Sequence, residues 1–360
     1  MRNQRRVVLF NNRRMGGISL LALLWLVLFS APATAQTEST SGLTRYEFVQ
    51  IRMGVPARIT VYAADEALAI QASDSAYERL KQLDRCLSDY DPDSELNQFC
   101  RKPCGTEVAV SPDLWTMLDE SQHYARSSQG ALDITVGPIV KLWRVSRRSK
   151  KLPDPEKLKT ALAAVGYENL QLNEAKKSAK LLKPNMQLDF GAIAKGYAAD
   201  EAYAVLAKHG LTIAMVAVAG DIRVGDPPPG QSGWRIAVEE RGANGPEEHH
   251  SIIVELCREG ISTAGDTYQY LELDGVRYSH IVDPKTGVGL TRPGSATVIA
   301  PTCTESDALD TLIFVLGREA GLEYLKQYPQ AVGLFVELNQ EGRPVQTPSP
   351  GWERRFPVAK

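Results

Sequence analysis

The sequence lacks the glycine signature G-x-G-x-x-G that follows the first strand of dinucleotide-binding parallel sheets. It also shows no strict alternation of strand and helix patterns, no internal repeat and no low-complexity linker. Strands and helices mixed in this way favour an α+β fold with mixed sheets, and we predict that the fold is not a Rossmann sheet. A dinucleotide ligand would have to bind through another geometry.

The chain has no surplus of basic residues, with 41 Lys and Arg against 43 Asp and Glu. Five of the arginines and none of the acids lie in residues 1–35, so residues 36–360 carry a net charge of −7. General nucleic-acid binding draws on basic surface, and this charge balance argues against it. We predict that residues 36–360 form a single domain, with two intimately joined subdomains as the alternative.

The N-terminal apolar run, Ile18–Phe29, falls short of the ~20 residues that a membrane-spanning helix needs. It follows five arginines and precedes Ala33-Thr34-Ala35, which has the small-x-small pattern of a cleavage site. This order is typical of a secretory signal peptide, so we predict cleavage near Ala35 and a periplasmic protein. An uncleaved N-terminal anchor is the alternative, and two Arg-Arg pairs leave twin-arginine export open.

Cysteine and histidine are scarce, with five of each. Cys100 and Cys104 are close in sequence, but no second close pair or adjacent histidine completes a tetrahedral zinc site. All five cysteines lie beyond the predicted signal peptide, where an oxidising compartment permits disulfides. We expect a structural bridge between Cys100 and Cys104, or between Cys86 and one of them, and no catalytic thiol.

Asp307, Asp310 and Thr311 have the i, i+3, i+4 spacing of one helix face. Mg²⁺ takes oxygen ligands, usually one or two carboxylates together with phosphate and water. The remainder of this segment is largely apolar, which favours a metal site over the alternative of a solvated polar face.

The segment Leu188–Gly196 (LDFGAIAKG) is predicted to pass from a strand into a long helix through small residues. Gly191 and Ala192 allow close approach of the backbone to a ligand. The Ala192 carbonyl could face a metal, and Lys195 could reach phosphate. The alternative is an ordinary strand-to-helix junction.

Other segments each allow one functional and one structural interpretation. His280, before an Asp-Pro turn, could accept a proton from a hydroxyl or be a structural histidine. Ser262–Asp266 is predicted to be a hydroxyl-rich turn suited to phosphate. Asp133 could contact a ligand or cap the next segment, and Tyr90 could stack on a flat ring or pack at a core edge. Arg144–Lys151 is predicted to be a basic loop that is either solvated or steers an acidic partner.

Six blocks in this order resemble the ApbE family, the FAD:protein FMN transferases, between about Tyr46 and Val336. The blocks are Ser88–Phe99, Ala131–Trp143, Leu188–Asp200, Ser262–Asp266, His280–Gly287 and Ser306–Gly317. The resemblance implies a T-fold-like architecture and Mg²⁺-dependent transfer of FMN from FAD to a Thr or Ser hydroxyl of an exported redox protein, releasing AMP. FAD would be a substrate, and membrane contact would come only through the acceptor or an uncleaved signal.

The same resemblance implies a role for each matching residue. His280 would be the general base. The FAD contacts would be Met53, Tyr90, Ala131, Leu132, Asp133, Asp189, Lys195 and Val282. The Mg²⁺ ligands would be the Ala192 carbonyl, Asp307, Asp310 and Thr311.

The chain departs from the family pattern at three places without losing a proposed ligand. Gly191-Ala192 stands where the family often has Gly-Gly, Gln269 where an arginine is common, and Ala219-Gly220-Asp221 where it has Gly-Gly-Asp. Two alternatives stay open: hydrolysis of FAD to FMN and AMP, and a periplasmic FAD-binding protein without chemistry. An intact histidine and acid set argues against the second.

Overall fold

A computed structural model describes residues 42–241, 249–266, 269–339 and 341–356. The predicted signal peptide, residues 1–35, lies outside the described residues. Within the described ranges, no helix combines the length and the apolar character that crossing a bilayer requires.

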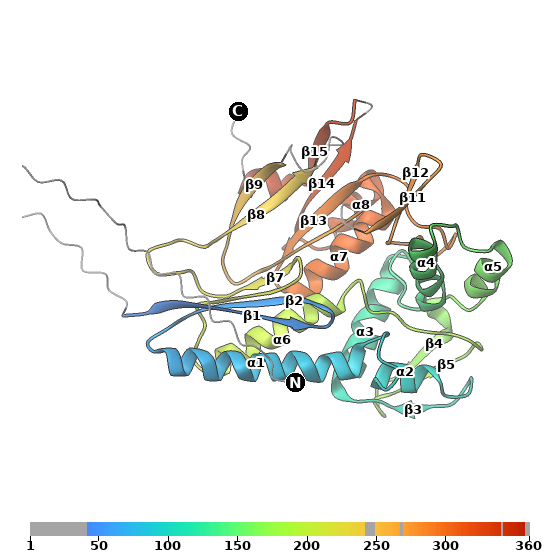
Figure 1. The fold of residues 1–360 in the computed structure, drawn as a ribbon, viewed down its shortest axis with the longest axis horizontal. Helices are drawn as coiled ribbons and strands as arrows, with labels where there is room; N and C mark the ends of the chain where they lie inside the picture. The colour runs from blue at the N-terminus through green and yellow to red at the C-terminus, as the bar shows by residue number, and fades with distance from the viewer. Residues whose placement is uncertain (1–41, 242–248, 267–268, 340, 357–360) are drawn as a thin grey trace, which may run out of the picture.

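The centre of the fold is an antiparallel sheet of eight strands in the order β1-β2-β6-β7-β10-β13-β14-β15 (Figure 1). The strands are β1 Thr44–Arg52, β2 Val55–Ala63, β6 Ala214–Val218, β7 Asp221–Val224, β10 Gly260–Gly265, β13 Gly294–Ala300, β14 Val332–Leu338 and β15 Pro344–Pro348. Because every pairing is antiparallel, the prediction of an α+β fold that is not a Rossmann sheet is confirmed.

Helices cover one face of this sheet, and a hairpin with a short helix covers the other (Figure 1). The first set is α1 Glu66–Leu87, α6 Ala194–Lys208, α7 Cys303–Leu316 and α8 Arg318–Leu325; the second is β8 Trp234–Arg241, β9 His249–Leu256 and α9 Pro350–Arg355. Alternation along the strands builds both cores: Val298 packs under the helices and the next residue, Ile299, packs under the hairpin.

A smaller region continues from the end of α1 and carries the remaining elements (Figure 1). These are α2 Glu95–Cys100, β3 Val108–Ala109, α3 Pro112–Ser127, α4 Gly137–Ser149, α5 Pro155–Ala163, β4 Leu170–Asn173, β5 Ser178–Leu181, β11 Tyr270–Leu273 and β12 Val276–Ser279. Trp143 ties α4 to the loop after β12, because its indole N–H donates to the Gly287 carbonyl at 2.8 Å.

Four local predictions were wrong. The basic run Arg144–Lys151 is no loop: helix α4 continues to Ser149, because Ile139, Trp143 and Ser146 form a buried stripe. Arg148, Lys150 and Lys151 stay exposed. The hydroxyl-rich segment Ser262–Gly265 belongs to strand β10.

The other two errors concern the junction before α6 and the cysteines. Leu188–Phe190 is not a strand of a sheet, although the Asp189 N–H donates to the Ile134 carbonyl at 2.8 Å. No disulfide forms, because all five cysteines are free thiols. Cys86 is buried beside Glu95 and Ser111 instead.

Candidate active site

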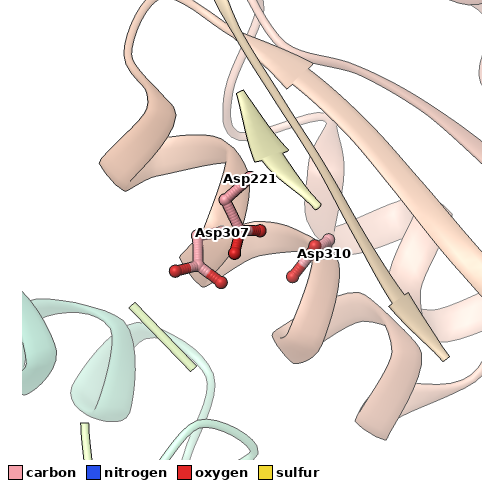
Figure 2. Close-up of side chains that lie close together, drawn as sticks. All are labelled: Asp221, Asp307 and Asp310. Carbon is pink, nitrogen blue, oxygen red and sulfur yellow. The ribbon is translucent and has the colours of Figure 1, made fainter. Parts of the chain in front are cut away.

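Three buried carboxylates converge between β7 and α7. Asp221 begins β7, and Asp307 and Asp310 lie on α7. At least one carboxylate oxygen of each lies within 4.8 Å of the others, and Figure 2 shows the three side chains pointing into one space. We call these residues the acid trio. Side chains that leave at most 3% of a residue exposed, as here, are rarely charged without a partner.

Local sequence explains how each acid arrives there. Thr302 caps α7, since its side chain accepts from the Glu305 N–H at 3.1 Å, and the i, i+3 spacing then places Asp307 and Asp310 on one side of the helix. Asp221 follows a tight turn between β6 and β7, in which Ala219 takes the left-handed conformation with φ of 56°.

Lys195, in the first turn of α6, is the cation beside the trio. Its ammonium forms an ion pair with Asp221 and lies 3.5 Å from Asp307. Burial opposes its charge, but Asp221 and Asp307 together raise the pKa of Lys195, so it stays protonated. The Gly196 N–H also donates to Asp307 at 2.8 Å.

One lysine does not satisfy three carboxylates. Burial, followed by repulsion from the neighbouring acids, raises the pKa of Asp307 and of Asp310. Thr311 partly offsets the rise in the pKa of Asp310, yet Asp310 Oδ1 is buried and has no hydrogen-bond partner in the described part of the chain. A buried oxygen without a partner is costly, and hard divalent cations take carboxylate oxygens as ligands. The oxygen ligands of the trio therefore fit a hard divalent cation such as Mg²⁺.

The Ala192 carbonyl is the fourth ligand that the sequence analysis proposed. Ala192 is half-buried in the turn that leads into α6, one turn before Lys195. This places it three residues before the lysine of the site, just outside α6. Its role as a ligand stays a prediction.

His280 follows β12 and is held by one carbonyl. Its Nδ1 lies 3.1 Å from the Gln269 carbonyl oxygen, and its backbone N–H donates to the same oxygen at 3.0 Å. Because a carbonyl only accepts, Nδ1 carries the proton in the neutral ring and Nε2 keeps a lone pair. Burial, with the charges of Arg147 and Lys195, lowers the pKa of His280 to about 4. The ring is thus a neutral base at physiological pH.

Tyr90 is the exposed aromatic of this region, with 74% of its surface accessible. The Arg144 guanidinium lies 4.0 Å from the centre of its ring. Arg144 in turn pairs with Asp89 and, at 2.9 Å, with Asp189. One face of Tyr90 is therefore supported by a cation.

The proposed flavin contacts differ in how much of each side chain is free. Asp133 is buried, and its oxygens accept hydrogen bonds from Thr135 and from the Tyr167 N–H (2.9 Å). It does not cap α4, because the N-terminus of that helix has no side-chain cap. Ala131 and Leu132 are buried beside it. Met53 lies in the β1–β2 turn with φ of 51°, and Val282 is buried and pairs with Gly289.

The sequence analysis missed two charged residues of the site. Asp221 had a signal, since it closes the Ala219-Gly220-Asp221 block, but it was not assigned to the metal. Arg144 was grouped with solvated basic residues, whereas it links Asp89, Tyr90 and Asp189.

Comparison with known proteins decides the family. The model of the ApbE family matches residues 53–335. The chain belongs to the ApbE family. Among curated ApbE relatives, the FAD:protein FMN transferase of Treponema pallidum is 31% identical over 306 residues, covering 81% of this chain and 84% of the relative. That of Haemophilus influenzae is 34% identical over 266 residues, covering 72% and 77%.

Solved ApbE structures agree in fold. The flavin transferase ApbE from Vibrio cholerae superposes with a TM-score of 0.78 at 28% identity, covering 87% of this chain and 99% of that one. The apo flavinyl transferase ApbE from Pseudomonas stutzeri also gives 0.78 at 28% identity, covering 88% and 98%. The ApbE architecture expected from the sequence is therefore confirmed.

Proposed function

We propose that this chain is a Mg²⁺-dependent FAD:protein FMN transferase that attaches FMN to a Thr or Ser hydroxyl and releases AMP. The observation that carries this proposal is the acid trio with its unpartnered Asp310 oxygen, in a chain whose curated relatives are named for the same transfer. A Mg²⁺ ion bound there would neutralise charge on the FAD diphosphate. Asp221, Asp307, Asp310 and Thr311, with the Ala192 carbonyl, are the residues that would hold it.

The chain's own groups supply the rest of the reaction. The acceptor hydroxyl oxygen bonds to the phosphorus of the FMN half of FAD, the bond from that phosphorus to the bridging oxygen breaks, and AMP leaves with that oxygen. His280 Nε2 takes the hydroxyl proton, because its Nδ1 is already committed to Gln269. Lys195, in the first turn of α6, holds its positive charge beside the trio, where phosphate oxygens would lie.

Tyr90 and its neighbours would hold the flat rings of FAD. The free face of Tyr90 offers stacking, and Met53, Ala131, Leu132, Asp133, Asp189 and Val282 complete the proposed contacts. Both Asp189 oxygens are already acceptors, one for Arg144 and the other for the Gly191 N–H, so Asp189 would contribute through the remaining lone pairs of these oxygens.

We further propose that the protein acts in the periplasm on an exported redox protein. Support comes from the signal-peptide pattern of residues 1–35. Residues 36–360 would then form one secreted transferase domain.

The test is to incubate the protein with FAD, Mg²⁺ and a candidate exported acceptor domain, and to measure AMP and the acceptor's mass. A covalent gain of FMN with one equivalent of AMP is expected. AMP released at the same rate without acceptor would indicate a hydrolase, and FAD binding without AMP would indicate a carrier. Either result would contradict the proposed transfer.

A further inference from the structure

Helices α6 and α7 cap each other. In one direction, the Gly196 N–H of α6 donates to Asp307 of α7 at 2.8 Å. In the other, the Cys303 and Thr304 N–H groups of α7 donate to Asp200 of α6 at 3.0 and 2.8 Å. On α7, Asp307 lies four residues after Cys303, and on α6, Asp200 lies four residues after Gly196. Carboxylates at helix N-termini are favourable because they satisfy free amides and oppose the helix dipole.

The backbones of α6 and α7 are packed so closely that the two helices have little room to approach one another further. A Cβ added at Gly196 would overlap the Cys303 carbonyl oxygen and lie 2.7 Å from Asp307 Cβ. A Cβ added at Gly260 of β10 would overlap the Cys303 backbone on another side. The first turn of α7 therefore packs between α6 and the sheet. The hydrogen bonds to Asp200 keep it from moving away from α6.

Strand β7 joins the same arrangement through Arg223, two residues after Asp221. The Arg223 guanidinium donates to the Pro301 carbonyl just before α7, and its Nε lies 3.6 Å from Asp200 Oδ1. Asp200 thus contacts α7 directly and β7 through Arg223, while it belongs to α6. These three elements carry the acid trio and Lys195.

We infer that Asp200 is a positioning residue for the acid trio. It does not take part in the trio itself. Its hydrogen bonds hold the first turn of α7 in the position that brings Asp307 and Asp310 next to Asp221. They oppose the mutual repulsion of the three carboxylates. This inference rests on the proposed cation site, and it adds a residue outside that site on which cation affinity depends.

The experiment replaces Asp200 with Asn, which keeps the size but turns one acceptor into an N–H₂ group facing an N–H donor. Mn²⁺ binding to the protein is measured by electron paramagnetic resonance, without FAD or acceptor. Loss of a residue that orients ligands typically weakens metal binding by about 10- to 100-fold, and we expect the Kd of D200N to rise in this range. At saturating Mg²⁺, the kcat for FAD turnover should recover to within about twofold, since no catalytic group is lost.

Asp113→Asn is the matched control. Asp113 also ties helices together, since it binds Arg79 of α1 and accepts from Tyr197 of α6 at 2.8 Å, but it lies in α3, away from α7. This variant should lose stability and keep the wild-type Mn²⁺ affinity. If it weakens Mn²⁺ binding as much as Asp200→Asn, the effect is general destabilisation and the inference fails.

Two further variants keep the result decisive. Should Asp200→Asn not fold, Thr304→Val removes only the hydroxyl that donates to Asp200 at 2.7 Å, and the Mn²⁺ Kd should still rise. An unchanged Kd in a folded Asp200 or Thr304 variant overturns the inference alone. An unchanged Kd in Asp310→Asn overturns the cation site itself, and the proposed function with it.

Discussion

The acid trio and the His280 region of this molecule respond to burial in opposite senses. In the trio, burial and neighbouring acids raise the pKa of Asp307 and Asp310. At His280, burial and neighbouring cations lower the pKa to about 4. Both environments favour the neutral form of the group.

The consequence differs because the two groups have different partners. The trio has more acceptor oxygens than the described part of the chain satisfies, so it could hold a cation. His280 already has a carbonyl for its one N–H and presents a lone pair, so it could accept a proton. In the proposed reaction the acid trio would hold the metal, and His280 would act on the acceptor hydroxyl.

The largest expected effect tests the trio. Asp310→Asn removes a buried carboxylate but keeps its shape. Loss of metal stabilisation worth several kcal/mol should lower the Mg²⁺-dependent transfer rate by about 10⁴-fold. The metal-free variant should unfold at the same or a higher temperature, because repulsion from Asp307 and Asp221 is gone.

Turnover assays and thermal unfolding check this prediction together. Asp226→Asn, which removes a carboxylate paired with Arg258 outside the trio, serves as the control. Wild-type transfer by Asp310→Asn at low Mg²⁺ would show that the trio is structural.

The next largest effect is expected at His280. His280→Ala should slow transfer by roughly 10²–10⁴-fold while FAD affinity is retained, because a positioned base is lost and no ring contact is. Stopped-flow transfer and FAD titration separate the two. If the variant binds FAD more weakly but transfers FMN from the bound complex at the wild-type rate, His280 holds the ligand and is not the base.

The pH dependence sharpens the contrast. An ordinary histidine of pKa 6.5 would lose base activity below that pH, whereas a folded pKa of about 4 extends activity of the free enzyme toward pH 4. The folded state favours neutral His280, so its contribution to stability is complete above pH 6.5 and is lost as pH falls from 6.5 toward 4. An acid limb of kcat/KM at 6.5 that disappears in His280→Ala would contradict the lowered pKa.

A smaller effect is expected at the stacking surface. Tyr90→Leu should weaken FAD binding by about 2- to 10-fold, the worth of an aromatic pair, while Tyr90→Phe should bind nearly as the wild type does. Fluorescence titration of FAD measures both. Equal loss in the two variants would indicate that the hydroxyl, and not the ring, carries the contact.

The smallest effect concerns the exposed basic end of α4. Replacing Arg148, Lys150 and Lys151 with Ser should lower the second-order rate with an acidic acceptor by about threefold at low salt, if these charges steer it. The difference should shrink above physiological salt, and hydrolysis of free FAD should not change. Arg147 is left in place because its charge acts on His280. If the variant and the wild type have equal rates at every salt concentration, these residues do not steer the acceptor and form only a solvated helix end.

Local spacing was enough to predict part of the site. Asp307, Asp310 and Thr311 were identified because the helix repeat puts them on one side of a single element, and the structure brings both acids together. A long helix was likewise expected from Ala192 onward, and it starts at Ala194.

The errors came where a short pattern has two solutions. Basic residues after Trp143 occur both in loops and on the outer face of a helix, and the buried stripe of Ile139 and Ser146 decided for a helix. The Cys100–Cys104 spacing permitted a bridge, but Cys100 ends α2 whereas Cys104 lies exposed beyond it.

The sequence by itself determined the α+β class, the ApbE family and the segments that carry chemistry, because these follow from local periodicity and ordered motifs. Only the tertiary structure decided that Asp221 completes the acid trio and that Arg144 supports Tyr90. Strand β7 and helix α7 are far apart in the chain, and their approach depends on sheet pairing and on the mutual capping of α6 and α7. Such contacts arise when whole elements pack against each other, and no short stretch of sequence predicts them.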